Sequence, residues 1–172
     1  TQAAGLTPEQ NRAIADPSSD GAVLTEPTFF FAEDQGYRTL ADLADMDIYL
    51  HSMIDTTRAY LRTHRELALR FMKGYVEGIA YFKKKRKESI DVLGKKLRTA
   101  PAQAKYLERS HTLYSSGYFE NAPYVSVKGV TTLLDFYAKD NSRARSANAQ
   151  SFFDNSLVKE LDDSGFIKKL YE

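Results

Sequence analysis

The residues best suited to chemistry stand where a short apolar stretch stops. Glu26, Pro27 and Thr28 follow Gly21–Thr25 and precede three consecutive phenylalanines. The Glu26 carboxylate can accept hydrogen bonds, the hydroxyls of Thr25 and Thr28 can accept and donate them, and the start of a following helix offers unpaired amides. Glu26 favours a ligand with a donor or a positive charge and opposes a bare anion. Alternatively, Glu26 only stabilises the helix N-terminus through its dipole.

The remaining reactive side chains predict no catalytic or metal centre. The three histidines, His51, His64 and His111, lack the spacing of metal ligands, and the sequence contains no cysteine. No nucleophile elbow, phosphate-binding loop, dinucleotide fingerprint or zinc-protease motif occurs. We therefore expect no cofactor. His51 and Ser52 stay candidates for ligand contact, while His64 is expected at a helix start and His111 on a helix surface.

Charge and hydropathy limit the partners. The 172 residues carry 24 basic and 23 acidic side chains, so no overall field attracts nucleic acid. No apolar stretch approaches the roughly 20 residues of a membrane span, and membrane insertion is not expected. The basic stretch Lys83–Lys87 could bind nucleic acid, but its simpler role is to end a helix, where cations complement the dipole.

Three strands are expected in the first third of the chain. Gly21–Thr25 is apolar enough for a buried strand, Tyr37–Leu40 has strand-forming residues, and a third is expected within Tyr49–Arg58, where Thr56 and Thr57 favour extended backbone. Pro27 suits the first turn of an intervening helix, which Gly36 would end. Phe29, Phe30 and Phe31 are expected mainly to hold that helix to its sheet.

Helices are expected in the remaining two thirds of the chain. Thr63 and Glu66 match a capping box before a long helix, and apolar stripes predict further helices. They are expected near residues 87–98, 102–118, 157–161 and 166–171, and after a Ser126 cap. Three strands are few for an α/β sheet, and Thr1–Gly5 contains neither an initiator Met nor a signal pattern. We therefore expect an α/β protein of which this is one piece.

Three stretches carry a resemblance to a known family. They are DGAVLTEPTFFFAEDQGYRTLADL at 20–43, TTRAYLRTHRELALRFMKGYVEGIAYFK at 56–83, and SFFDNSLVKELDDSGFIKKLY at 151–171. Together they resemble the C-terminal half of a periplasmic solute-binding protein of the nitrate/sulfonate/taurine type, which serves an ABC importer. No single motif is diagnostic, but the order of the motifs is fairly specific.

The resemblance implies a partial type II periplasmic-binding fold, α/β, with few strands near the N-terminus and a mostly helical C-terminal portion. Residues 1–48 would end lobe two, 49–52 would form the hinge crossing, and 53–172 would belong to lobe one. Thr25, Glu26, Thr28, His51, Ser52 and Thr56 would contact the ligand. The protein would be exported to the periplasm or cell exterior by a signal that this chain lacks.

The expected function is capture of a small organic or oxyanion solute between two lobes and its delivery to the transmembrane permease subunits. Nitrate, sulfonates, taurine-like zwitterions, pyrimidines and aromatic carboxylates all remain open as ligands. One alternative is a same-fold enzyme that makes the thiamine pyrimidine precursor, although the cysteine-rich motif typical of that type is absent from this sequence. The other alternative is a helical protein-interaction module.

Overall fold

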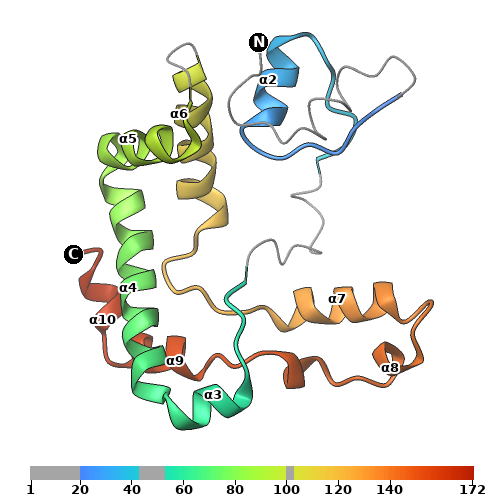
Figure 1. The fold of residues 1–172 in the computed structure, drawn as a ribbon, viewed down its shortest axis with the longest axis vertical. Coiled ribbons are helices and arrows are strands. Elements are labelled where there is room, and N and C mark those ends of the chain that lie inside the picture. Colours follow the sequence, from blue (N-terminus) through green and yellow to red (C-terminus); the bar gives the residue numbers. More distant parts are fainter. Residues whose placement is uncertain (1–19, 43–52, 100–102) are drawn as a thin grey trace. The chain divides into compact units, whose positions relative to one another are not determined.

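In the part of the chain that the structure describes, the regular elements are helices (Figure 1). The computed structural model describes residues 20–42, 53–99 and 103–172. The helices are α2 (Thr28–Asp34), α3 (Arg58–Thr63), α4 (Arg65–Lys84), α5 (Arg86–Leu97), α6 (Ala104–Leu113), η3 (Tyr114–Tyr118), α7 (Val127–Tyr137), α8 (Ser142–Arg145), η4 (Ala149–Phe152), α9 (Ser156–Asp163) and α10 (Phe166–Lys169).

The prediction of an α/β fold is wrong, because the described part of the chain contains no strand. The stretches 21–25, 37–40 and 53–57 are irregular. Val23 is 78% exposed and Leu40 is 80% exposed, whereas a buried strand would hide such side chains. β-branched and apolar residues favour a strand only where a neighbouring strand takes up its backbone groups. None does so here, and the partial type II periplasmic-binding fold is not present in these residues.

The helices predicted from apolar periodicity are confirmed, and their ends depend on local capping. Ser126 caps α7 as predicted, since its Oγ accepts a hydrogen bond from the Gly129 amide at 3.3 Å. Gly36 ends α2 at φ 88°, a left-handed conformation that suits glycine. The Thr63 capping box is wrong, because Thr63 is the last residue of α3. A threonine cap is found at the start of α3, where Thr57 accepts from the Tyr60 amide at 3.1 Å.

The chain divides into two compact units. The first contains the described parts of residues 1–40 and 81–119, and the second those of residues 41–80 and 120–172. The long helix α4 belongs to the second unit up to Ala80 and to the first unit from Tyr81. The predicted hinge at 49–52 lies outside the described residues, and the predicted lobe boundaries stay predictions.

The second unit has a small hydrophobic core. Val76 on α4 packs with Val158 and Leu161 on α9 and Ile167 on α10, all four being buried. The predicted core-facing stripe of the long helix is therefore correct at Val76. In the same unit the side chain of Asn155 forms two hydrogen bonds with the backbone of Val125. It accepts one from the amide at 2.9 Å and donates one to the carbonyl at 3.0 Å.

In the first unit α6 lies against both α5 and α2. Leu107 is 3% exposed and packs close to Gly94 of α5, where an added Cβ would approach a Leu107 methyl to 3.5 Å. Arg86 at the start of α5 crosses to α6 and pairs with Glu108 at 2.8 Å. These contacts occupy one face of α6, and α2 packs on another face of the same helix.

Candidate ligand-binding site

The short helix α2 is held on α6 by charges and rings. Asp34 accepts hydrogen bonds from Lys105 and from the Tyr106 hydroxyl, the latter at 3.0 Å. Arg109 pairs with Glu33 at 2.8 Å, and its guanidinium lies over the Phe30 ring, 3.9 Å from the centroid. The phenylalanines thus pack against a helix and not a sheet. This docking carries Glu26, just before α2, to the C-terminal end of α6.

Glu26 meets Tyr114 at that end. The Tyr114 hydroxyl donates to Oε2 of Glu26 over 3.3 Å, and both residues are half-buried. Tyr114 opens η3, a π-helical turn that follows α6 directly. Such wide turns are frequent at functional sites because they shift side chains out of α-helical register. The predicted site residue Glu26 therefore lies beside a tyrosine that the turn presents.

Aromatic rings continue from Tyr114 into the unit. Its ring centroid lies 5.3 Å from that of Tyr118 and 5.2 Å from that of Phe119. Phe119 in turn packs edge-on against Phe82, with 5.3 Å between centroids. We call Phe82, Tyr114, Tyr118 and Phe119 the aromatic cluster. Because rings offer flat faces for stacking and for cations, the cluster gives the Glu26 carboxylate an apolar and polarisable neighbourhood.

His111 lies under the cluster and not on the surface. The prediction of a surface histidine is wrong, since the side chain is 2% exposed. Its ring stacks on Phe82 with centroids 4.4 Å apart, and Nε2 lies 2.7 Å from the Phe82 carbonyl oxygen. Nδ1 lies 3.2 Å from Nη1 of Arg86. With both nitrogens engaged by the fold, His111 supports the site and is not a ligand contact.

One buried polar atom in this region has no partner. The Ser110 hydroxyl is hidden on α6, one turn before Tyr114, and no hydrogen-bond partner for it is found in the described structure. Ser110 itself is 7% exposed. Buried hydroxyls are normally hydrogen-bonded, so an unpaired one calls for a ligand or a water. It adds a possible donor to the face of α6 that ends at Tyr114.

Glu26 differs electrostatically from the other acids near α2. Hydrogen bonds from Lys105 and then Tyr106 hold the pKa of Asp34 below its ordinary value, and Asp34 raises the pKa of Lys105 in return. Glu33 has Arg109 as its cation. Within the described residues Glu26 forms no ion pair, and the donor found for its carboxylate is the neutral Tyr114 hydroxyl. A carboxylate has about four acceptor positions, so Glu26 can accept further hydrogen bonds from a ligand.

The other predicted contact residues are dispersed. Thr25 is half-buried, and its carbonyl accepts from the Phe29 amide at 3.1 Å, while Thr28 is 1% exposed. Thr56 is exposed and belongs to the second unit. His51 and Ser52 lie outside the described residues. The structure thus places Thr25, Glu26 and Thr28 at one turn, and the ligand contacts remain predictions.

Sequence reasoning missed Tyr114 and Tyr118 as site residues. Both were assigned to one long helix, whereas α6 ends at Leu113 and the wider turn begins there. The sequence does carry a signal in Tyr114-Ser115-Ser116-Gly117-Tyr118. Two serines and a glycine are poor helix formers, and they interrupt the α-helix where the tyrosines must turn.

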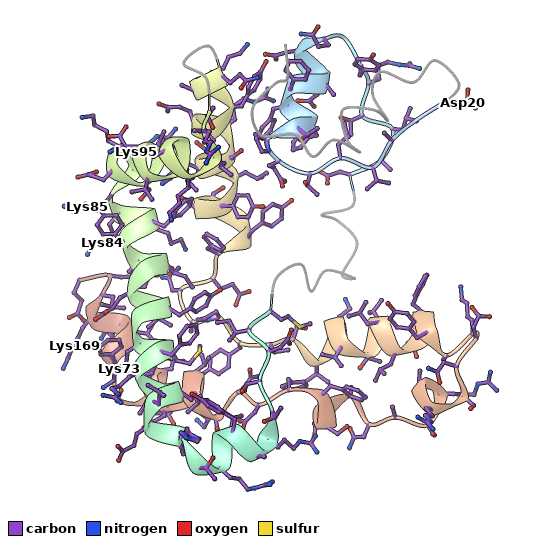
Figure 2. The ribbon with its side chains drawn as sticks, viewed as in Figure 1. Asp20, Lys73, Lys84, Lys85, Lys95 and Lys169 are labelled. Atoms are coloured by element: carbon purple, nitrogen blue, oxygen red, sulfur yellow. The ribbon has the colours of Figure 1, made fainter. Side chains whose placement is uncertain are left out.

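The basic stretch 83–87 has the structural role expected of it. α4 ends at Lys84, and Lys83 donates to the Phe119 carbonyl at 2.7 Å. Lys84 and Lys85 extend away from the ribbon in Figure 2. Among residues 20–42, 53–99 and 103–172, no group of three or more His, Asp or Glu side chains is placed to hold a metal ion. Within the same residues, no helix has both the length and the hydropathy that a bilayer crossing needs.

Comparison of the chain with models of protein families, with curated proteins and with solved structures finds no match.

Proposed function

We propose that the chain captures a small organic solute for delivery to an ABC importer. The observation that carries the proposal is the half-buried Glu26 carboxylate, which has one neutral hydrogen-bond donor and no cation among the described residues. The order of motifs in residues 20–43, 56–83 and 151–171, which resembles solute-binding proteins, supports it independently. The proposal relies on this local site and requires no sheet.

The chemistry of the site selects among the possible solutes. A carboxylate taken partly out of water is stabilised by a ligand that brings a positive charge or strong N–H donors. The rings of Tyr114 and Tyr118 favour a flat or cationic body. A taurine-like ammonium or an amino-substituted pyrimidine meets both requirements. Bare nitrate is flat, but it brings neither a positive charge nor an N–H donor and would face the negative charge of Glu26.

Titration calorimetry with the full chain tests the proposal. The solutes are taurine, an aminopyrimidine, an aliphatic sulfonate, an aromatic carboxylate and nitrate. We expect saturable binding of at least one of the first two and weaker binding of nitrate. Absence of saturable binding for all five solutes would overturn solute capture. The variant Glu26→Gln should weaken this binding. Its matched control is Asp135→Asn, which removes an exposed carboxylate of α7 and should leave the binding unchanged.

Delivery is tested separately with an ABC permease reconstituted in vesicles. We expect its ATP hydrolysis to rise only when the chain and its bound solute are both present. A solute that binds but leaves hydrolysis unchanged would contradict the importer role while leaving solute binding in place.

A second candidate function is favoured by a different observation. The regular elements of the described chain are all helices, and large apolar side chains are exposed, including Phe71 at 57%, Phe136 at 64% and Phe152 at 62%. Exposed apolar residues on helices are typical of protein-binding surfaces. A stable complex with a purified protein partner in the absence of any solute, together with no response to the five solutes, would favour this function.

A further inference from the structure

One face of α4 is apolar, exposed and regularly spaced. Leu67, Phe71, Gly74 and Gly78 follow one another at intervals of four, three and four residues, the heptad spacing of helices that pack in pairs. Leu67 is 45% exposed and Phe71 is 57% exposed. The core residue Val76 lies on the opposite side of the helix, because the α-helical period turns it away from this row. We call these four residues the α4 seam.

The two glycines of the seam have no structural reason within the described fold. A Cβ added at Gly74 or at Gly78 would meet nothing within 4 Å. Glycine weakens a helix interior relative to alanine, so its presence twice, one turn apart, needs another explanation. Glycines at this spacing let a second helix approach closely. The seam therefore has the shape of a helix-docking surface with nothing docked on it.

Two charges beside the seam restrict what can dock. Arg70 and Glu77 are both exposed, and neither has an ion-pair partner in the described part of the chain. They are seven residues apart, which is two helical turns and about 10 Å along the axis. Both precede an apolar residue of the seam by one position and so lie on the same flank of it. A second α4 lying parallel and in register would place the two copies of this flank on opposite sides of the helix pair, so neither charge would meet its opposite.

An antiparallel second copy brings the two charged flanks together and fills the glycine gap. When two α4 helices cross at Gly74, residues before it on one helix face residues after it on the other. Arg70 then lies within one residue of the level of Glu77 of the second copy, and the reverse pair forms by symmetry. Phe71 likewise lies within one residue of the level of Gly78, where the missing side chain leaves room for its ring. Charge and shape thus agree on the same partner and the same direction.

We propose that the α4 seam is the interface of a dimer formed by two antiparallel copies of this chain. The interface places Phe71 of each copy over Gly78 of the other and forms two Arg70–Glu77 ion pairs across the two-fold axis. The inference is independent of the proposed solute site, which lies on other residues.

Charge reversal tests the direction and the partner together. Sedimentation velocity of the full chain over a range of concentrations should show a monomer–dimer equilibrium. Arg70→Glu and Glu77→Arg alone should each weaken dimerisation by about tenfold or more, because like charges then face each other. The double variant Arg70→Glu/Glu77→Arg should return to within about threefold of the original constant. Failure of the double variant to recover would contradict the antiparallel pairing.

The glycine gap is tested by filling it. Gly78→Leu should abolish the dimer while the helical circular dichroism of the chain stays intact, because the added side chain meets open space in the single copy. Phe71→Ala should weaken the dimer, whereas Phe136→Ala, which truncates an equally exposed ring on α7, should not. A chain that stays monomeric at about 100 µM, or a dimer indifferent to Gly78→Leu, would overturn the proposal.

Discussion

The Nε2 atom of His111 lies 2.7 Å from the carbonyl oxygen of Phe82, whose ring also stacks on the imidazole. A carbonyl oxygen only accepts hydrogen bonds, so the geometry fits the tautomer with its proton on Nε2. Nδ1 is then the acceptor for Arg86. One side chain thereby connects the end of α4, the start of α5 and the last turn of α6.

Replacement of His111 should destabilise the first unit. We expect His111→Ala to lower the free energy of unfolding by about 2–4 kcal/mol, because it leaves a cavity and removes a hydrogen bond from the Phe82 carbonyl. Urea unfolding followed by circular dichroism measures the change. His64→Ala is the matched control, since His64 is exposed at the end of α3. Equal effects of the two substitutions would show that the buried contacts contribute little.

Replacement of Asn155 should loosen the second unit. Its amide group accepts from and donates to the backbone of Val125, so Asn155→Ala leaves two backbone groups without partners. We expect a loss of about 1–3 kcal/mol in the free energy of unfolding. Asn155→Asp keeps the acceptor and loses the donor, and its effect should be intermediate. Hydrogen exchange at the Val125 amide provides a local readout, and unchanged protection in Asn155→Ala would contradict the role of this pair.

Docking of α2 on α6 should weaken in acid. The pKa of Asp34 is lowered in the folded state, chiefly by its hydrogen bond from Lys105. A lowered folded-state pKa stabilises the fold above the unfolded-state value, about 3.9, and that stabilisation is lost as the pH falls through the folded-state pKa. Unfolding midpoints measured from pH 7 to pH 3 should therefore converge for the original chain and Asp34→Asn. If the gap between them instead stays constant below pH 4, the Asp34 pair is not the cause.

Replacing glycine by alanine should stabilise the chain at two positions and destabilise it at a third. Gly74→Ala and Gly78→Ala should each raise the monomer's free energy of unfolding by about 0.5–1 kcal/mol, because the helix gains propensity and the Cβ meets no neighbour. Gly165→Ala should lower it by a similar amount or more, because Gly165 has φ 72° at the start of α10. Thermal unfolding at low protein concentration compares the three. A loss of stability in Gly78→Ala would mean that this face is occupied within one chain.

The two ends of the Glu26–Tyr114 hydrogen bond should differ in their effect on solute binding. We expect Glu26→Gln to lower the affinity for an ammonium-bearing solute by about 10–100-fold, the range for loss of a charged hydrogen-bond partner. Tyr114→Phe keeps the ring and should cost about 2–10-fold, as for a neutral hydrogen bond. Calorimetry with the solute that binds best measures both. A larger effect for Tyr114→Phe would assign the recognition to the hydroxyl and not to the carboxylate.

Helices were predictable from the sequence because their signal is local. The stripe that includes Val76 and the Ser126 cap both depend on residues within a few turns of one another, and both are present. Strands were not predictable on the same basis. Gly21–Thr25 has a strand's composition, but a strand forms only with a partner elsewhere in the chain, and no described segment pairs with it.

The candidate site was predictable in part for the same reason. Glu26 stands out locally, between an apolar stretch and a helix start. Its neighbour Tyr114 is 88 residues away in the sequence, and only the docking of Phe30 and Asp34 on α6 brings the two together. His111 was misplaced because its burial comes from α4 and α5, which its own helix does not reveal.

The wide turn at Tyr114–Tyr118 makes the site depend on residue count as well as residue type. Each residue of an α-helix rotates the following side chains by about 100°. Deleting Ser116 would put Tyr118 three residues after Tyr114 in place of four and so change the relative direction of the two rings, even though every aromatic residue remained. Substitutions at Ser115 and Ser116 should therefore be tolerated far better than a one-residue deletion, and sequences that share this site should share the length of the turn.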